Sequence, residues 1–180
     1  NTLLASEISG DFTEFSVKFQ LCNLKVLPVE EILGFALQSP YKYYYYNFFG
    51  VKFTGDGKSI KTVSIVRSRR KDPNAGYSVK NNFTVDTLFT MDYQMQYNHD
   101  YVVKIEKKDD TITLFVDGKK IFREKLPTAE LSGGFALASR GASVSYDYVD
   151  IKKGDTTILH DDFDQDSIKV FKVEARKVEK

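Results

Sequence analysis

A dense aromatic stretch followed by an arginine cluster is the part of this sequence best suited to binding a ligand. Tyr and Phe fill seven of the nine positions from 41 to 49. An exposed Tyr ring offers an apolar face for sugar C–H groups and a hydroxyl for hydrogen bonds. Because alternate residues of a strand face opposite sides, Tyr43 and Tyr45 are predicted to share one face. Arg67 and Arg69, on the next predicted strand and its end, would add polar contacts to hydroxyls or to an acidic sugar.

A second interpretation of these residues stays open. The aromatic side chains of this stretch would then fill the core and cover a sheet edge, and the arginines would only be solvated. Aromatic rings interleaved with basic residues can also stack nucleic-acid bases. The net charge of +1 argues against nucleic acid, because no overall positive field draws the chain to it.

A tight acidic cluster near the C-terminus is the one candidate for a metal site. Asp161, Asp162, Asp164 and Asp166 supply the hard oxygen donors that Ca²⁺ prefers. The glycine and the final glutamate of an EF-hand loop are missing. The sequence therefore predicts either a structural calcium, held first by Asp161 and Asp162, or a solvated acidic turn.

Catalytic motifs are absent from the sequence. The two histidines are isolated, and neither His-Glu-x-x-His nor Cys-x-x-Cys spacing occurs. No Gly-x-Ser-x-Gly nucleophile elbow is present. Glu30 and Glu31 are adjacent, so on a strand they point to opposite faces and do not form an acid–base pair. Carboxylates from distant strands can still meet in the fold, so an enzyme remains the less favoured alternative.

The elements that must position these residues are strands. The segment 101–126, YVVKIEKKDDTITLFVDGKKIFREKL, alternates apolar and polar residues, which predicts strands with one buried face. Asp117-Gly118 predicts a tight hairpin turn. No amphipathic helix of normal length appears, and turns recur about every ten residues. This pattern predicts an all-β sandwich or jelly roll.

Size and composition fit one domain. With 180 residues, 42% hydrophobic and 28% charged, the chain can bury a core and keep a polar surface. No apolar run is long enough to span a membrane. The predicted organisation is a single domain over residues 1–180.

Two segments carry a family resemblance. YVVKIEKKDDTITLFVDGKKIF, followed by GGFALASRGASVSYDYVDIKKG, resembles the second half of concanavalin A-like (laminin G-like) jelly rolls of bacterial glycan-binding or glycoside-hydrolase-associated type. ISGDFTEFSVKFQL and ILGFALQS resemble their first half. Bacterial members often begin with an Asp-Asp-Phe strand, which this chain carries only near its C-terminus, at residues 161–163. Residues 161–180 would then be a permuted terminal strand, the start of a further domain, or an acidic turn.

The resemblance implies a fold and several functions. The fold would be a two-sheet antiparallel jelly-roll sandwich, and the function non-catalytic carbohydrate binding through an aromatic-lined concave sheet. The alternatives are a glycoside hydrolase with a non-standard carboxylate pair, since the Glu-x-Asp-x-x-Glu pattern of laminarinase-type relatives is missing, and a structural or protein-interaction domain. A structural calcium near the terminal strands, a glycan partner, other domains of a larger protein, and an extracellular, periplasmic or cell-surface location are also expected.

Overall fold

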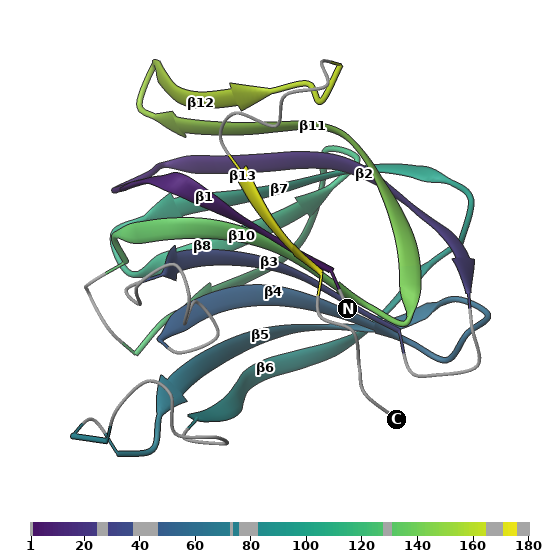
Figure 1. Ribbon diagram of the computed structural model, residues 1–180, viewed down its shortest axis with the longest axis horizontal. Helices are drawn as coiled ribbons and strands as arrows, with labels where there is room; N and C mark the ends of the chain where they lie inside the picture. The colour runs from purple at the N-terminus through teal and green to yellow at the C-terminus, as the bar shows by residue number, and fades with distance from the viewer. Residues whose placement is uncertain are drawn as a thin grey trace.

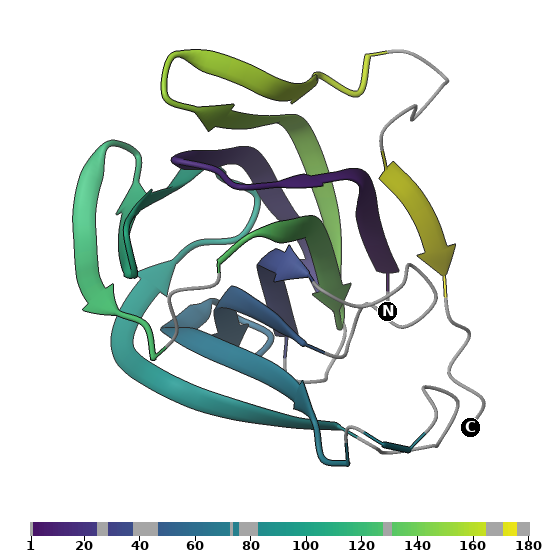
Figure 2. The same ribbon diagram turned by 90° about the vertical axis from the view of Figure 1, so that its left-hand side faces the viewer.

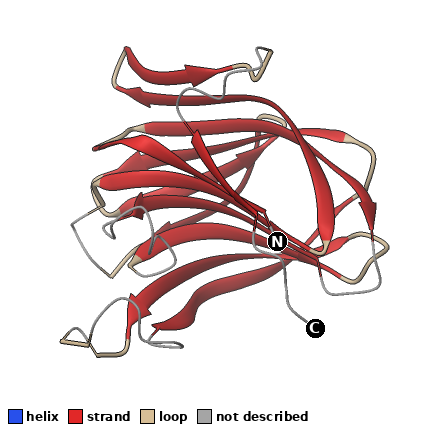
Figure 3. Ribbon diagram, in the orientation of Figure 1, coloured by secondary structure: helices blue, strands red, loops and turns tan. Residues whose placement is uncertain are grey.

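The computed structural model describes residues 2–24, 29–37, 47–72, 74–75, 83–127, 131–164 and 171–175. This part of the chain forms thirteen strands and no helix (Figure 3). It also contains no helix that could cross a membrane. The strands are β1 (Thr2–Gly10), β2 (Glu14–Leu24), β3 (Val29–Leu37), β4 (Phe48–Gly55), β5 (Ile60–Arg70), β6 (Phe83–Met95), β7 (Asp100–Lys108), β8 (Thr111–Val116), β9 (Lys119–Lys125), β10 (Gly133–Arg140), β11 (Ala142–Lys153), β12 (Thr156–Asp161) and β13 (Phe171–Ala175).

The strands form two antiparallel sheets that pack face to face. Sheet A has seven strands in the order β13-β1-β10-β3-β4-β5-β6, and sheet B has six in the order β12-β11-β2-β7-β8-β9 (Figure 1). Viewed along the strands, sheet A curves around its outer face from β1 and β13 to β6 (Figure 2). The predicted all-β, two-sheet antiparallel sandwich is therefore confirmed.

Alternating apolar residues build the core between the sheets. On β2, Phe15, Val17, Phe19 and Leu21 are buried, and the polar residues between them face outward. Phe135 of sheet A lies against Phe15 of sheet B, with ring centroids 5.4 Å apart. Such edge-to-face ring pairs lock the two layers together.

The hairpin predicted at Asp117-Gly118 is confirmed. The two residues connect β8 to β9, and both have positive φ, at 49° and 76°. The side chain of Asp117 accepts a hydrogen bond from the amide of Val102 at 2.8 Å, and its amide donates to the Val102 carbonyl. Asp and Gly suit this turn because they tolerate the left-handed conformation that its twist requires.

The C-terminal segment contributes an edge strand to sheet A. β13 pairs antiparallel with β1 along five residue pairs, from Thr2 with Ala175 to Ser6 with Phe171. The interpretation of residues 161–180 as a permuted terminal strand stays a prediction. The extent of the domain over residues 1–180 stays a prediction.

Candidate ligand-binding face

The outer face of sheet A carries one polar row and one mixed row, which cross five neighbouring strands and together form the polar rows of this face. The strand register places one residue of β10, β3, β4, β5 and β6 in each row. With strands about 4.8 Å apart, each row is about 19 Å long. The first row is Arg140, Glu30, Thr54, Thr62 and Asp92, and the second is Ala138, Ile32, Lys52, Ser64 and Thr90.

A carboxylate held between two cations lies at the β10 end of these rows. Glu30 Oε1 lies 3.5 Å from Lys52 Nζ, and Glu30 Oε2 lies 3.8 Å from Arg140 Nη1. The side chains of Glu30 and Lys52 are 28% and 22% exposed. Both are therefore partly accessible to a ligand on the outer face of the sheet. The cluster therefore presents hydrogen-bond donors and acceptors at one end of a row of threonine hydroxyls.

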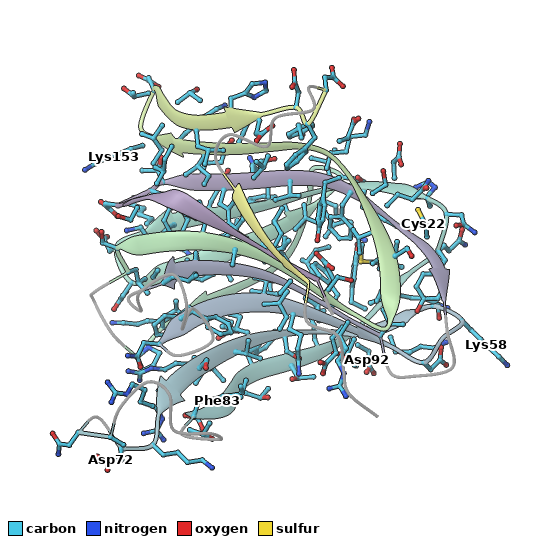
Figure 4. The ribbon with its side chains drawn as sticks, in the orientation of Figure 1. Cys22, Lys58, Asp72, Phe83, Asp92 and Lys153 are labelled. Carbon is cyan, nitrogen blue, oxygen red and sulfur yellow. The ribbon has the colours of Figure 1, made fainter. Side chains whose placement is uncertain are left out.

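The opposite end of the first row is acidic. Asp92 is exposed on β6 and lies next to Thr62 in the register. Figure 4 shows Asp92 and Phe83 towards opposite ends of the long β6 strand, so the polar rows lie at the end that leads into the β6–β7 turn. Carboxylates at both ends and hydroxyls between them form a surface that can exchange hydrogen bonds with a polyhydroxylated chain.

A third row, next to the polar rows, is made of small residues. Ala136, Gly34, Gly50, Val66 and Thr87 follow one another across the same five strands. Val66 is fully buried, although it faces away from the core cluster. A Cβ at Gly50 would lie 2.9 Å from Ile32 Cγ2 and 3.3 Å from the Leu33 carbonyl oxygen. The glycine is needed because the curved sheet leaves no room for a side chain.

We expect Gly50→Ala to destabilise the protein by about 1 to 3 kcal/mol, because overpacking forces Ile32 and the β3 backbone to shift. Equilibrium denaturation in urea measures this change. Gly10→Ala is the matched control, since nothing lies within 4 Å of its Cβ. Equal destabilisation by the two substitutions would show that loss of glycine, and not crowding at Gly50, is responsible.

The two arginines predicted to bind a ligand lie on the other side of β5. Arg67 pairs with Phe49 in the register, and its guanidinium carbon lies 5.4 Å from the centroid of that core ring. Arg69 shares this side and donates from Nε to Asp86 Oδ2 at 2.7 Å. Both arginines therefore lie on the inner side of sheet A. Tyr43 and Tyr45 lie outside the described residues.

The acidic cluster near the C-terminus makes local turns. The side chain of Asp161 accepts from the Phe163 amide at 2.9 Å, and that of Asp162 accepts from the Asp164 amide at 3.3 Å. Among the described residues, no group of three or more His, Cys, Asp or Glu side chains is arranged to hold a metal ion. A structural calcium at Asp161 and Asp162 stays a prediction.

Glu31, the neighbour of Glu30, points into the interior. Its side chain is fully buried, and Oε1 accepts a hydrogen bond from the Tyr146 hydroxyl at 2.5 Å. Oε2 has no hydrogen-bond partner among the described residues. Burial raises the pKa of Glu31 to about 8, although the side chains of Tyr146 and Ser139 lower it in part. The pKa of Tyr146 is also raised, by burial and by the nearby carboxyl group. Glu31 is thus a protonated interior acid at neutral pH.

Comparison with known proteins identifies the fold. No protein-family profile and no curated protein sequence matches the chain. Among solved structures, a carbohydrate binding module, CBM66, from Bacillus subtilis superposes with a TM-score of 0.59 at 11% identity, over 80% of this chain and 76% of that chain. The fold is that of a concanavalin A-like jelly roll.

Two enzymes have similar structures. A laminarinase from Flavobacterium sp. UMI-01 superposes with a TM-score of 0.54 at 9% identity, over 84% of this chain and 78% of that chain. A beta-glucanase from Bacillus licheniformis gives a TM-score of 0.51 at 11% identity, over 83% of this chain and 70% of that chain. The concanavalin A-like resemblance of the sequence is therefore confirmed at the level of the fold.

Sequence reasoning did not assign the candidate face of this concanavalin A-like sheet. The adjacent pair Glu30 and Glu31 was predicted to point to opposite faces, and it does. The pattern did not indicate that Lys52 and Arg140 flank Glu30, because they lie 22 and 110 positions away in the chain. Their proximity depends on the order of strands in sheet A.

Proposed function

We propose that this protein binds an oligosaccharide or polysaccharide along the outer face of sheet A, without cleaving it. The observation that carries the proposal is the first row, in which Glu30 lies between Lys52 and Arg140 beside the hydroxyls of Thr54 and Thr62. Sugar hydroxyls donate and accept hydrogen bonds, so fixed donors and acceptors in one line suit them. The similar structures include a carbohydrate binding module, a laminarinase and a beta-glucanase, which supports a carbohydrate ligand.

Binding is favoured over hydrolysis by the carboxylates of this face. Across the described strands β10, β3, β4, β5 and β6, only Glu30 and Asp92 point outward as carboxylates. Three strand spacings separate them, or about 14 Å. Glycosidases place their two carboxyl groups about 5 to 9.5 Å apart, with one on each side of the scissile bond. The two carboxylates are therefore too far apart for this chemistry.

We also propose further ligand contacts and a cellular location. Tyr43 and Tyr45 are proposed to extend the ligand contacts. Arg67 and Arg69 would contact a ligand that continues around the open end of the sandwich. We also propose an extracellular, periplasmic or cell-surface location, where polysaccharides are accessible, and attachment to other domains of a larger protein.

The proposal can be tested by removing the cations beside Glu30 and, as a control, an ion-paired lysine on the other sheet. Lys52→Met, combined with Arg140→Ala, should weaken binding of the bound oligosaccharide by about tenfold or more, because it removes the donors beside Glu30. Lys18→Met is the matched control, since Lys18 pairs with Asp147 on the outer face of sheet B. Isothermal titration calorimetry against a panel of neutral and acidic oligosaccharides gives the affinities.

The same panel tests cleavage. We expect no release of reducing ends after prolonged incubation with any oligosaccharide that binds. Cleavage that survives purification to homogeneity would favour the hydrolase alternative. Absence of binding across the panel, with and without Ca²⁺, would instead favour a structural or protein-interaction domain.

A further inference from the structure

Most cations on the outer face of sheet B are neutralised by neighbouring carboxylates. Lys18 Nζ lies 2.5 Å from Asp147 and 3.7 Å from Asp100. Lys104 Nζ lies 2.6 Å from Glu106, and it also reaches Glu14 at 3.9 Å. In these ion pairs the charges of β2, β7 and β11 offset one another, so this part of the sheet attracts a charged ligand only weakly.

The free edge of this sheet, β9, is different. Lys120 and Arg123 pair in register with Phe115 and Thr113, so they point outward from sheet B. Both side chains are exposed, and no carboxylate of the described residues lies within ion-pair distance of either. Lys108, at the end of β7, is exposed in the same way. Three cations therefore remain unneutralised along one side of the sheet.

A cavity of about 470 Å³ lies beside these cations. Arg123 and Lys108 line it together with the side chains of Thr111 and Thr113. The two carboxylates of its wall, Glu14 and Glu106, are already paired with lysines outside the cavity, Glu14 with Lys152 at 3.6 Å and Glu106 with Lys104 at 2.6 Å. The free charge of the cavity is therefore positive, and hydroxyl groups surround it.

The floor of the cavity is a rigid part of the fold. The backbone of Thr13 donates to the Lys152 carbonyl at 2.7 Å and accepts from the Lys107 amide at 2.8 Å. The Thr13 hydroxyl accepts from the Gly154 amide at 2.9 Å. The backbone on this side of the cavity is therefore held in place before a ligand binds, which lowers part of the entropic cost of binding.

We propose that this cavity and the outward cations of β9 bind the anionic groups of an acidic glycan, either uronate carboxylates or sulfate esters. Arg123 offers the planar fork that pairs with carboxylate or sulfate oxygens, and the threonines match sugar hydroxyls. Lys120 lies about 7 to 10 Å further along the strand, which suits a second anionic group on the same chain. The site is separate from the outer face of sheet A, and it goes beyond the function proposed there.

A nucleic acid, which is also a polyanion, fits this surface less well. Binding of single strands relies on exposed aromatic rings that stack on bases. Phe115 is the aromatic residue beside Lys120, and Lys104 Nζ lies 4.8 Å from its ring centroid. Its ring face is thus already occupied by a cation, so the surface favours hydrogen-bonding sugars over bases.

The test measures binding of four probes of equal length at low and at physiological salt. The probes are an oligogalacturonate, a sulfated oligosaccharide, a neutral oligosaccharide and a single-stranded oligonucleotide. Lys120→Ala with Arg123→Ala should weaken binding of the preferred acidic oligosaccharide by about tenfold or more. The matched control is Lys58→Ala with Lys71→Ala, which removes the same charge at exposed positions. Figure 4 shows Lys58 pointing away from the body of the protein.

Each outcome bears on the proposal. The control pair should change the affinity less than about twofold, and both double variants should keep the thermal midpoint of the wild type. Lys52→Met with Arg140→Ala should leave acidic-glycan binding at β9 intact, so failure of the site on sheet A is distinguishable from failure here. The proposal is overturned by equal weakening in the control pair, by tighter binding of the oligonucleotide, or by no binding of either acidic oligosaccharide at low salt.

Discussion

Replacing Glu31 with Gln should make the protein less sensitive to alkaline pH. Glu31 has a pKa of about 8 in the folded protein, raised by burial from its ordinary value of 4.5. Below pH 4.5 the carboxyl group is protonated in both states, and its contribution to stability is fully present. As the pH rises towards 8, only the unfolded chain loses the proton, so the folded state loses stability progressively. The total loss is up to about 5 kcal/mol.

The measurement is the free energy of unfolding in urea at several pH values between 4.5 and 9. The wild type should lose stability across this range relative to Glu31→Gln, because the amide cannot ionise but still accepts a hydrogen bond from Tyr146. Glu30→Gln, which changes the neighbouring solvent-facing carboxylate, is the control and should keep the pH dependence of the wild type. Parallel pH profiles for the wild type and Glu31→Gln would show that the buried acid does not govern this dependence.

Replacing Phe135 with Ala should destabilise the protein by about 3 to 5 kcal/mol, as large-to-small changes in well-packed cores do. The Phe135 ring is fully buried, and it contacts the rings of Phe12 and Phe15, each with a centroid separation of 5.4 Å. The substitution thus removes the contact that joins sheet A to sheet B at this position. Since small domains have total stabilities of about 5 to 15 kcal/mol, the variant would be close to unfolding.

The control makes the same chemical change on a solvent-facing side. Phe115 is partly exposed on the outer face of sheet B, where Lys104 lies over its ring. Phe115→Ala should cost about 1 kcal/mol or less. Denaturation midpoints and slopes of both variants, measured side by side, decide the comparison. Similar losses in the two variants would mean that ring burial between the sheets is not the main source of stability.

Glu31 lies among aromatic residues of the interior. Glu31 pairs with Phe53 across β3 and β4, and Tyr146 packs against Phe19 at a centroid distance of 6.4 Å. A protonated acid is tolerated there because Tyr146 satisfies one of its oxygens. Glu30 faces Lys52 and Arg140 on the outer side of β3, whereas burial of Glu31 on the inner side disfavours its charged form. Opposite faces of one strand thus give two adjacent glutamates different surroundings, one in solvent-facing ion pairs and the other fully buried.

The sequence by itself determined the local structure of this protein. Strict alternation along β2, β7 and β8 decided which residues are buried, because successive side chains of a strand point to opposite faces. Asp117-Gly118 determined a turn because few other pairs adopt its backbone angles. The fold class followed from these local rules, together with the resemblance of residues 101–153 to concanavalin A-like domains.

Only the tertiary structure decided which residues share a surface. The order of strands in sheet A places Arg140 of β10 beside Glu30 of β3 and Lys52 of β4, although Arg140 lies 110 positions from Glu30. The register also placed Arg67 and Arg69 on the inner side of β5, whereas the sequence pattern had suggested a shared ligand-binding face with Tyr43 and Tyr45. Alternation along one strand indicates that residues face the same side, but not which neighbouring strand completes the site. That choice is made by long-range pairing between strands, and no local pattern encodes it.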